Sequence, residues 1–197
     1  MQEITGLIEK EREKIFLMDQ PLFTVMFLVD REVPMSQVDR IRQELRKTGS
    51  LHIAEGGYPQ GDLELSPLIY HAVGLPRLLP PLNALTLDKK ELEKLGGNLY
   101  TIDLSARNLS PREVDEGLQA HIGNSKEGKY VVSLEYDGEI PYGQYVEAVD
   151  MVWNVVYRFR EELSRKNYSL SYDELGPDLQ REIRKAYPMA MSENMHR

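Results

Sequence analysis

The stretch that decides the fold is Tyr136-Asp137-Gly138-Glu139-Ile140-Pro141-Tyr142-Gly143-Gln144, which lies between an apolar run and a long amphipathic segment. A similar stretch occurs much earlier in the chain: Val29-Asp30-Arg31-Glu32-Val33-Pro34-Met35-Ser36-Gln37. Asp, Glu, Pro and Gln recur in register, and Val33 corresponds to Ile140. Each copy predicts a strand, a charged turn and a helix, because a proline with its fixed φ is tolerated at the start of a helix. Using this unit twice indicates an internal duplication.

The composition is that of an ordinary globular protein. The 197 residues are 28% charged and 41% hydrophobic, which allows one large domain or two small ones. A net charge of −8, without any basic block, argues against nucleic-acid binding and weakly against docking on anionic lipid. The absence of cysteine excludes disulfides, thiolate metal sites and cysteine nucleophiles. The apolar runs 22–29 and 151–156 are too short to cross a bilayer, so we expect the chain as given to be soluble.

Residues 1–56 are expected to form a first half of the type α-β-α-β. Its helices and strands are predicted at 2–18, 22–29, 36–47 and 51–54. Ser36 is the predicted cap of the second helix, with Asp39 at the capping-box position. The two strands around this helix should run parallel with a right-handed crossover. Residues 57–97, rich in Pro and Gly, are predicted to be an ordered linker with short helices at 66–73 and 87–95.

Residues 98–166 are expected to form a second unit of the type β-α-β-α. Its strands and helices are predicted at 99–104, 110–122, 130–134 and 144–166. Ser110, Pro111 and Glu113 agree on the start of the first helix as cap, first helical residue and capping-box partner. The second unit has no obvious closing strand. One possibility is that the two halves complete each other's sheet. Residues 167–197 are predicted to be a helical tail with a helix near Pro177 and a polar end. The fold class is therefore α+β, with two related β-α-β units and a helical C-terminal extension.

The second unit resembles the periplasmic domain of the ExbD/TolR family of biopolymer transport proteins. Strands of that family commonly end in Asp-x-x-(Val/Ile)-Pro-Tyr-Gly, which Asp137, Ile140, Pro141, Tyr142 and Gly143 match. The first half is similar at its corresponding turn. Two further segments are similar to the branch of the family that has an extended C-terminus, and they are Leu75-Pro76-Arg77-Leu78-Leu79-Pro80-Pro81 and the stretch from Phe159 to Pro188.

The resemblance implies a non-enzymatic component of a proton-driven, TonB/Tol-type energy-transducing complex for transmembrane and protein transport. Its implied partners are a second copy in a homodimer, an ExbB/TolQ-like membrane protein, and a TonB-like protein or peptidoglycan. Family members carry an N-terminal transmembrane helix with a proton-conducting aspartate, and no residue here matches it. The expected location is therefore the periplasm, attached to the inner membrane if such a helix precedes this stretch, and otherwise a soluble one.

The residues expected to contact partners lie in the two turns, and they are Asp30, Glu32, Pro34, Asp137, Glu139, Pro141 and Tyr142. On the long helix, Val149, Trp153 and Val156 are expected in the core or, if the helix projects beyond the domain, in a dimer seam. The acidic residues could instead form paired carboxylates for acid–base chemistry, but charge at a strand-to-helix turn is favoured by the helix dipole alone. The four histidines, His52, His71, His121 and His196, lack metal-ligand spacing.

Two other functions remain open from the sequence. A soluble regulatory module could bind a small ligand between the two halves, under the linker. A hydrolase could use the acidic turns, and it would need a concave pocket that joins Asp30 and Glu32 to Asp137 and Glu139. No nucleophile elbow, Walker loop or dinucleotide fingerprint occurs in the sequence.

Overall fold

The computed structural model describes residues 2–16, 24–47, 52–57, 71–73, 97–106, 110–125 and 128–196. These residues fall into two compact units. The first comprises Met1–Ala84, Asp137–Val146 and Arg197, and the second comprises Leu85–Tyr136 and Glu147–His196. Both turns of the repeated stretch therefore belong to the first unit. The mixture of helices and strands confirms the predicted α+β class.

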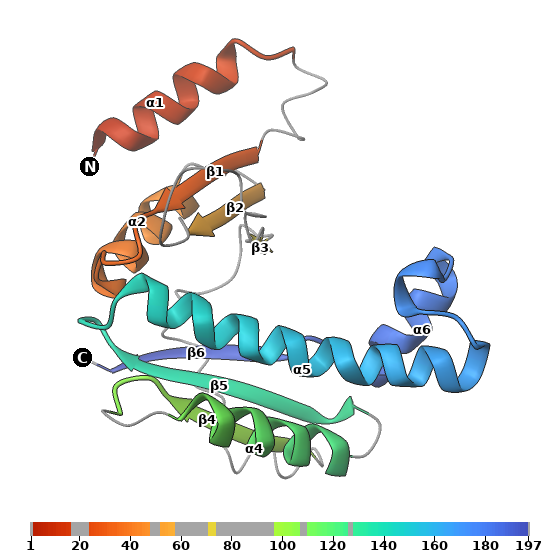
Figure 1. Ribbon diagram of the computed structural model, residues 1–197. Helices are drawn as coiled ribbons and strands as arrows, with labels where there is room; N and C mark the ends of the chain where they lie inside the picture. Colours follow the sequence, from red (N-terminus) through yellow and green to blue (C-terminus); the bar gives the residue numbers. More distant parts are fainter. Residues whose placement is uncertain are drawn as a thin grey trace. The chain divides into compact units, whose positions relative to one another are not determined.

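The first unit has one small sheet. Its elements are α1 (Gln2–Glu13), β1 (Thr24–Val29), α2 (Met35–Lys47), β2 (His52–Gly57) and β3 (His71–Val73), as Figure 1 shows. The strand order is β1-β2-β3. β1 and β2 are parallel, from Thr24 opposite His52 to Val29 opposite Gly57, which confirms the arrangement predicted around the intervening helix.

Two predictions for this unit need correction. Residues His71–Val73 were expected to end a helix, but they form β3, which pairs antiparallel with β2 so that Val73 lies opposite Ile53. Pairing satisfies the backbone groups at the edge of β2, which a helix there would leave without partners. α1 ends at Glu13 rather than at residue 18, and the amide of Lys14 bonds to the carbonyl of Glu11 in a tightened last turn. The other predicted helical positions, 66–70 and 87–95, lie outside the described residues.

The second unit has a separate three-stranded sheet. Its elements are β4 (Asn98–Asp103), α4 (Pro111–Asn124), β5 (Tyr130–Asp137), α5 (Tyr142–Tyr168), the 3₁₀ turn η4 (Tyr172–Glu174), α6 (Pro177–Ala186) and β6 (Met191–His196). The order is β4-β5-β6, and β4 and β5 are parallel. Within the residues that the structure describes, β1-β2-β3 and β4-β5-β6 are distinct sheets, and no strand of one half pairs with a strand of the other.

α4 begins where its sequence signals predicted. The Ser110 hydroxyl accepts a hydrogen bond from the amide of Glu113 at 3.4 Å, and Pro111 is the first helical residue. The helix buries Val114, Leu118 and Ile122, which recur at helical spacing. It approaches β4 closely at Gly117, where a Cβ atom would overlap the hydroxyl of Tyr100. A larger residue at this point of the helix would therefore require the Tyr100 side chain to move.

The core of the second unit lies between β5 and α5, which run alongside each other in Figure 1. Val132 and Leu134 of β5 are fully buried, and so are Val152, Val155 and Val156 of α5 or nearly so. Burial on most positions of β5 is typical of the central strand in a parallel sheet.

The polar end of the tail forms the third strand, β6. The carbonyl of Ala190 accepts a hydrogen bond from the amide of Val132 at 2.9 Å, and the carbonyl of Pro188 accepts one from the Tyr130 hydroxyl at 2.6 Å. From Tyr130 to Val132 the bonded residue changes from Pro188 to Ala190, so residue numbers increase in the same direction along both segments. β6 therefore runs parallel to β5. The tail is therefore only partly helical: α6 begins at Pro177 as predicted, but the closing strand was missed because Met191–His196 is polar and contains no β-branched residue.

Candidate functional site

The two copies of the repeated stretch bind each other inside the first unit. Pro34 and Pro141 lie opposite each other in an antiparallel β-bridge. On either side of this pair, the amide of Tyr142 donates to the carbonyl of Val33 at 2.8 Å, and the amide of Met35 donates to the carbonyl of Ile140 at 2.9 Å. The two turns therefore contact each other, and contact with an external partner through them stays a prediction.

A second pair of hydrogen bonds extends the contact. The amide of Ser36 donates to the carbonyl of Gly138, and the amide of Gly143 donates to the carbonyl of Arg31, both at 2.8 Å. The first amides of a helix have no acceptor within the helix and must find one elsewhere. Here the first two amides of α2 and of α5 find it in the opposite turn.

This arrangement corrects the predicted role of Ser36 as a helix cap. α2 begins at Met35, so Ser36 already lies in its first turn and its amide serves the cross-contact. The prolines suit the central position for a related reason. In an antiparallel pair whose neighbours make the hydrogen bonds, the central residues need no N–H of their own. Pro34 and Pro141 can therefore face each other without losing a bond.

Asp30 and Asp137 hold the shape of the two turns. A carboxylate oxygen of Asp30 accepts the amide of Glu32, and one of Asp137 accepts the amide of Glu139, both at 2.9 Å. Such bonds to the amide two residues on stabilise a turn without any chemistry. The side chains of all four acidic residues are exposed. This geometry supports the structural interpretation of the acidic residues.

A buried polar cluster beside the turns was not predicted. Tyr142 and Tyr145 stack with their ring centroids 6.0 Å apart. The guanidinium carbon of Arg42 lies 5.0 Å from the centre of the Tyr145 ring, and Arg42 donates to Asp39 at 3.0 Å. Arg42 and Asp39 are only 4% and 7% exposed. Asp39, which was expected to complete a capping box, is therefore one member of a buried ion pair.

The position of Tyr142 also differs from the prediction. Its side chain is 2% exposed, so it is part of this cluster and offers almost no surface to another protein. Pro34 and Pro141 are half-buried and face each other. Of the seven residues predicted to contact partners, the four carboxylates are exposed, the two prolines are half-buried and Tyr142 is buried.

The three residues predicted as a dimer seam occupy different environments. Val149 and Val156 are 4% and 0% exposed within the single chain, which is the core alternative. A second chain could not contact them without displacing their own packing. Trp153 is half-buried, and the guanidinium carbon of Arg160 lies 5.6 Å from its ring centre. Dimerisation through α5 remains a prediction. Val149 and Val156 are too deeply buried in the single chain to be its contact residues.

Arg160 joins α5 to the tail. It is 4% exposed, and its Nε donates to the carbonyl of Tyr187 at 2.9 Å. Its guanidinium carbon also lies 5.8 Å from the centre of the Tyr172 ring. Placement over two aromatic rings favours a desolvated guanidinium. Burial lowers the pKa of Arg160, because desolvation penalises the charged guanidinium.

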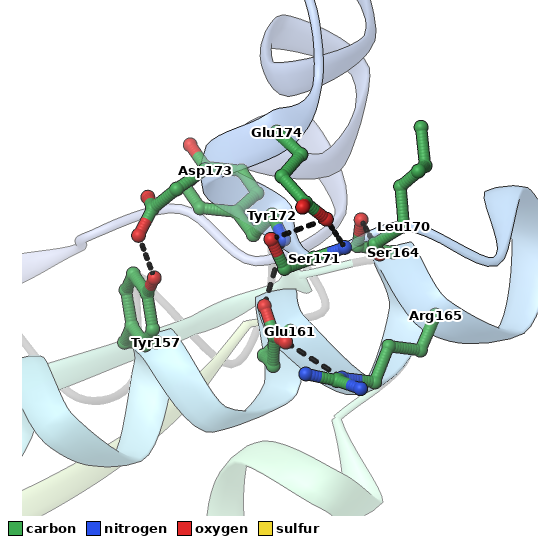
Figure 2. A network of polar contacts seen from close by, with 9 residues as sticks. All are labelled: Tyr157, Glu161, Ser164, Arg165, Leu170, Ser171, Tyr172, Asp173 and Glu174. Carbon is green, nitrogen blue, oxygen red and sulfur yellow. Dashed lines mark hydrogen bonds and ion pairs between the residues drawn. The ribbon is translucent and has the colours of Figure 1, made fainter.

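Figure 2 shows a polar network that fixes the turn after α5. Glu161 accepts the amide of Tyr172 at 2.7 Å and a hydrogen bond from Arg165 at 2.6 Å. The pKa of Glu161 is lowered, first by the Tyr172 amide and then by Arg165. Nearby, Tyr157 donates to Asp173, and this hydrogen bond raises the pKa of Tyr157 to about 12. These hydrogen bonds join α5 to the 3₁₀ turn η4.

A pocket of about 200 Å³ lies elsewhere, at the end of β4 and the start of α4. Its lining includes Tyr100, Asp103, Ser110 and Glu113. None of the acidic residues of the two turns contributes to it. A hydrolase that used the acidic turns would need a pocket joining them, and this cavity is not that pocket.

The described part of the chain contains no cluster of metal ligands and no helix that could span a membrane. Among residues 2–16, 24–47, 52–57, 71–73, 97–106, 110–125 and 128–196, no three His, Asp or Glu side chains gather as metal ligands. His121 instead packs between two rings, with centroids 5.4 Å from Tyr100 and 6.5 Å from Tyr130. None of the helices in these ranges is long and apolar enough to cross a bilayer.

Comparison of the chain with protein-family models, with curated proteins and with solved structures found no match in any of the three.

Proposed function

We propose that this protein is a non-enzymatic component of a proton-driven, energy-transducing transport complex and acts by contact with other proteins or with the cell wall. The observation that carries the proposal is the turn Asp137 to Gly143, which resembles the corresponding turn of the ExbD/TolR family. The proposed partners are an ExbB/TolQ-like membrane protein and a TonB-like protein or peptidoglycan. The proposed location is the periplasmic side of the inner membrane.

The way in which the turns use their polar groups supports a contact function rather than chemistry. Asp30 and Asp137 hold backbone amides, and the turn carbonyls satisfy the first amides of two helices. The remaining carboxylates, Glu32 and Glu139, are exposed. Exposed charges contribute to recognition mainly through the rate and selectivity of encounter with a partner of opposite charge.

A binding experiment tests this proposal. The purified chain is titrated into a TonB-like protein by calorimetry and sedimented with peptidoglycan sacculi, and it is co-purified with an ExbB/TolQ-like protein in detergent. We expect binding in at least one assay and a clear loss with Glu32→Lys/Glu139→Lys. Glu162→Lys, which changes an exposed charge on α5, is the matched control and should bind normally. Failure to bind in all three assays would overturn the proposal.

A regulatory module that binds a small ligand is the second candidate, and the pocket between β4 and α4 is the observation in its favour. Ligand pockets usually have volumes of about 300–1,000 Å³. At about 200 Å³ this pocket is smaller than that range, and two carboxylates, those of Asp103 and Glu113, line it. It suits at most a small cationic or neutral molecule, which places this function second.

A further inference from the structure

The contact between the two turns has the symmetry of a two-fold dimer. If each residue of the first copy is exchanged for its equivalent in the second, the bond from Tyr142 to Val33 becomes the bond from Met35 to Ile140. The same exchange converts the bond from Ser36 to Gly138 into the bond from Gly143 to Arg31. A two-fold interface between identical subunits has this property, since each contact must occur twice.

Each turn also needs a partner for a physical reason. Without the opposite turn, the first two amides of each helix would lose their acceptors. In an isolated copy these amides would bond to water, whereas inside the contact an amide left without its acceptor would cost about 1–3 kcal/mol. In this chain the second copy of the same motif supplies those acceptors.

The two copies differ where identical copies would fit poorly. Arg31 of the first copy faces Gly143 of the second, where a Cβ atom would lie only 3.0 Å from the Arg31 side chain. The residue of the first copy equivalent to Gly143 is Ser36, which does carry a Cβ atom. Two first copies would therefore crowd Arg31 against Ser36. Two second copies would place Gly138 against Gly143 and leave a gap.

The buried cluster shows the same preference for unlike copies. Arg42 of the first copy lies over Tyr145 of the second. The equivalents of these residues are Val149 and Val38, respectively. A pair of first copies would place a guanidinium near valine instead of an aromatic ring. A pair of second copies would lose the cation–π contact.

From these observations we infer that the repeated turn is a self-association surface that is closed within one chain. Each copy occupies the binding surface of the other, so the chain is a fused dimer at this contact and does not use the surface to bind a second chain. This inference does not depend on the proposed transport function. Any external partner must bind to surfaces other than the faces of Pro34, Pro141 and Tyr142.

The absence of cysteine from the chain allows a direct test. Cα atoms of residues opposite each other without hydrogen bonds between them lie about 4.5 Å apart, which suits a disulfide. We expect Pro34→Cys/Pro141→Cys to form an intrachain disulfide in mild oxidant, seen as a monomer with faster migration before reduction and as the expected loss of two hydrogens by mass spectrometry. Pro34→Cys and Pro141→Cys alone should stay monomeric, as should the exposed control Glu162→Cys.

The same experiment can overturn the inference. In a homodimer of like copies, Pro141→Cys or Pro34→Cys would meet its own equivalent and form covalent dimers well above the level of the Glu162→Cys control. In a swapped dimer, the double variant would give covalent dimers instead of an intrachain bond. Both results would show that the surface binds a second chain.

Hydrogen exchange of the unaltered chain provides a test that does not require the cysteine variants to fold. We expect the amides of Met35, Ser36, Tyr142 and Gly143 to be protected, and the protection to stay the same over a hundredfold dilution. Protection that falls on dilution would mean that the acceptors come from another chain. Absence of protection at any concentration would mean that the turns do not pair in solution. Either result would overturn the inference.

Discussion

The two turns have the same backbone and different surroundings. Asp, Glu, a β-branched residue and Pro occur in both copies, and they hold the turn and the bridge with hydrogen bonds of nearly equal length. The residues that differ are those that face the other copy, such as Arg31 against Gly143 and Arg42 against Tyr145. The residues that fix the backbone of the turn are the same in both copies. The residues that pack across the contact differ between the copies and are complementary.

The helices that follow the turns differ in the same sense. α2 has 13 residues and contributes a buried ion pair, whereas α5 has 27 residues and contributes a stripe of valines to the core of the second unit. The start of each helix is determined by the same proline turn. Its length and its buried face are determined by what it packs against. The comparison teaches that local turn chemistry repeats more faithfully than the packing it supports.

The largest expected effect is at Arg42, because this guanidinium is buried against Asp39 and its equivalent in the second copy, Val149, carries no charge. Arg42→Ala removes a buried guanidinium from Asp39 and from the Tyr145 ring. Breaking a buried pair by removing one partner costs about 3–5 kcal/mol. The equivalent change, Val149→Ala, removes two methyl groups at about 0.8 kcal/mol each and should cost about 2 kcal/mol. Urea unfolding of both variants measures the difference.

A third variant separates the charge from the packing at this site. Asp39→Asn in the Arg42→Ala background removes the carboxylate that has lost its cation, so it should recover part of the stability. If Arg42→Ala is no more costly than Val149→Ala, and Asp39→Asn recovers nothing, the ion pair does not distinguish the two copies.

A smaller effect is expected where Arg31 faces Gly143. Gly143→Val should destabilise the chain by about 1–3 kcal/mol, the usual cost of overpacking, because its Cβ atom would crowd Arg31. Arg31→Gly in the same background removes the crowding and should restore part of the stability. Thermal unfolding of the single and double variants measures this coupling. Purely additive effects of the two changes would contradict the proposed complementarity.

The sequence predicted the elements that local signals determine. The proline turns, the cap at Ser110 and the start of α6 at Pro177 were all found at or within two residues of their predicted positions. Each depends on the chemistry of a few neighbouring residues, which the sequence displays directly. The duplication was visible for the same reason, since both copies repeat the residues that the turn requires.

Features that depend on distant partners could not be predicted in this way. The polar segment Met191–His196 forms the strand β6 because it pairs with the edge of β5. The residues of this segment do not themselves predict a strand. Pairing of the two turns joins residues far apart in the chain, and the buried state of Arg42 follows from that pairing. The repeat indicated that the two turns could pair with each other. A contact between distant segments leaves no periodic pattern in the sequence, so the pairing itself could not be predicted.

Equal effects are expected where the two copies are chemically identical. Asp30→Ala and Asp137→Ala each remove one carboxylate that accepts the amide two residues on, at 2.9 Å in both turns. Because both side chains are exposed, each change should cost about 1 kcal/mol, in the range of an ordinary hydrogen bond. Chemical denaturation of the two variants provides the comparison. Unequal losses would show that the turns differ in more than their packing. Asp30→Asn and Asp137→Asn, which keep an acceptor oxygen, should be nearly neutral controls.

The smallest effect is expected in the network after α5, for which the first copy has no equivalent because α2 ends at Lys47. The pKa of Glu161 is lowered by the amide of Tyr172 and by Arg165, and the pKa of Glu174 is lowered by the amide and side chain of Ser171. A carboxyl whose pKa is lower in the folded than in the unfolded chain stabilises the fold above the unfolded pKa of about 4.3, and this contribution is lost as pH falls through the folded value. Urea unfolding at pH 7 and at pH 3 should therefore show a smaller acid-induced loss of stability in Glu161→Gln than in the unaltered chain. Glu162→Gln, a neighbouring exposed residue, is the control and should follow the unaltered chain; the same loss in all three proteins would mean that the network does not stabilise the tail.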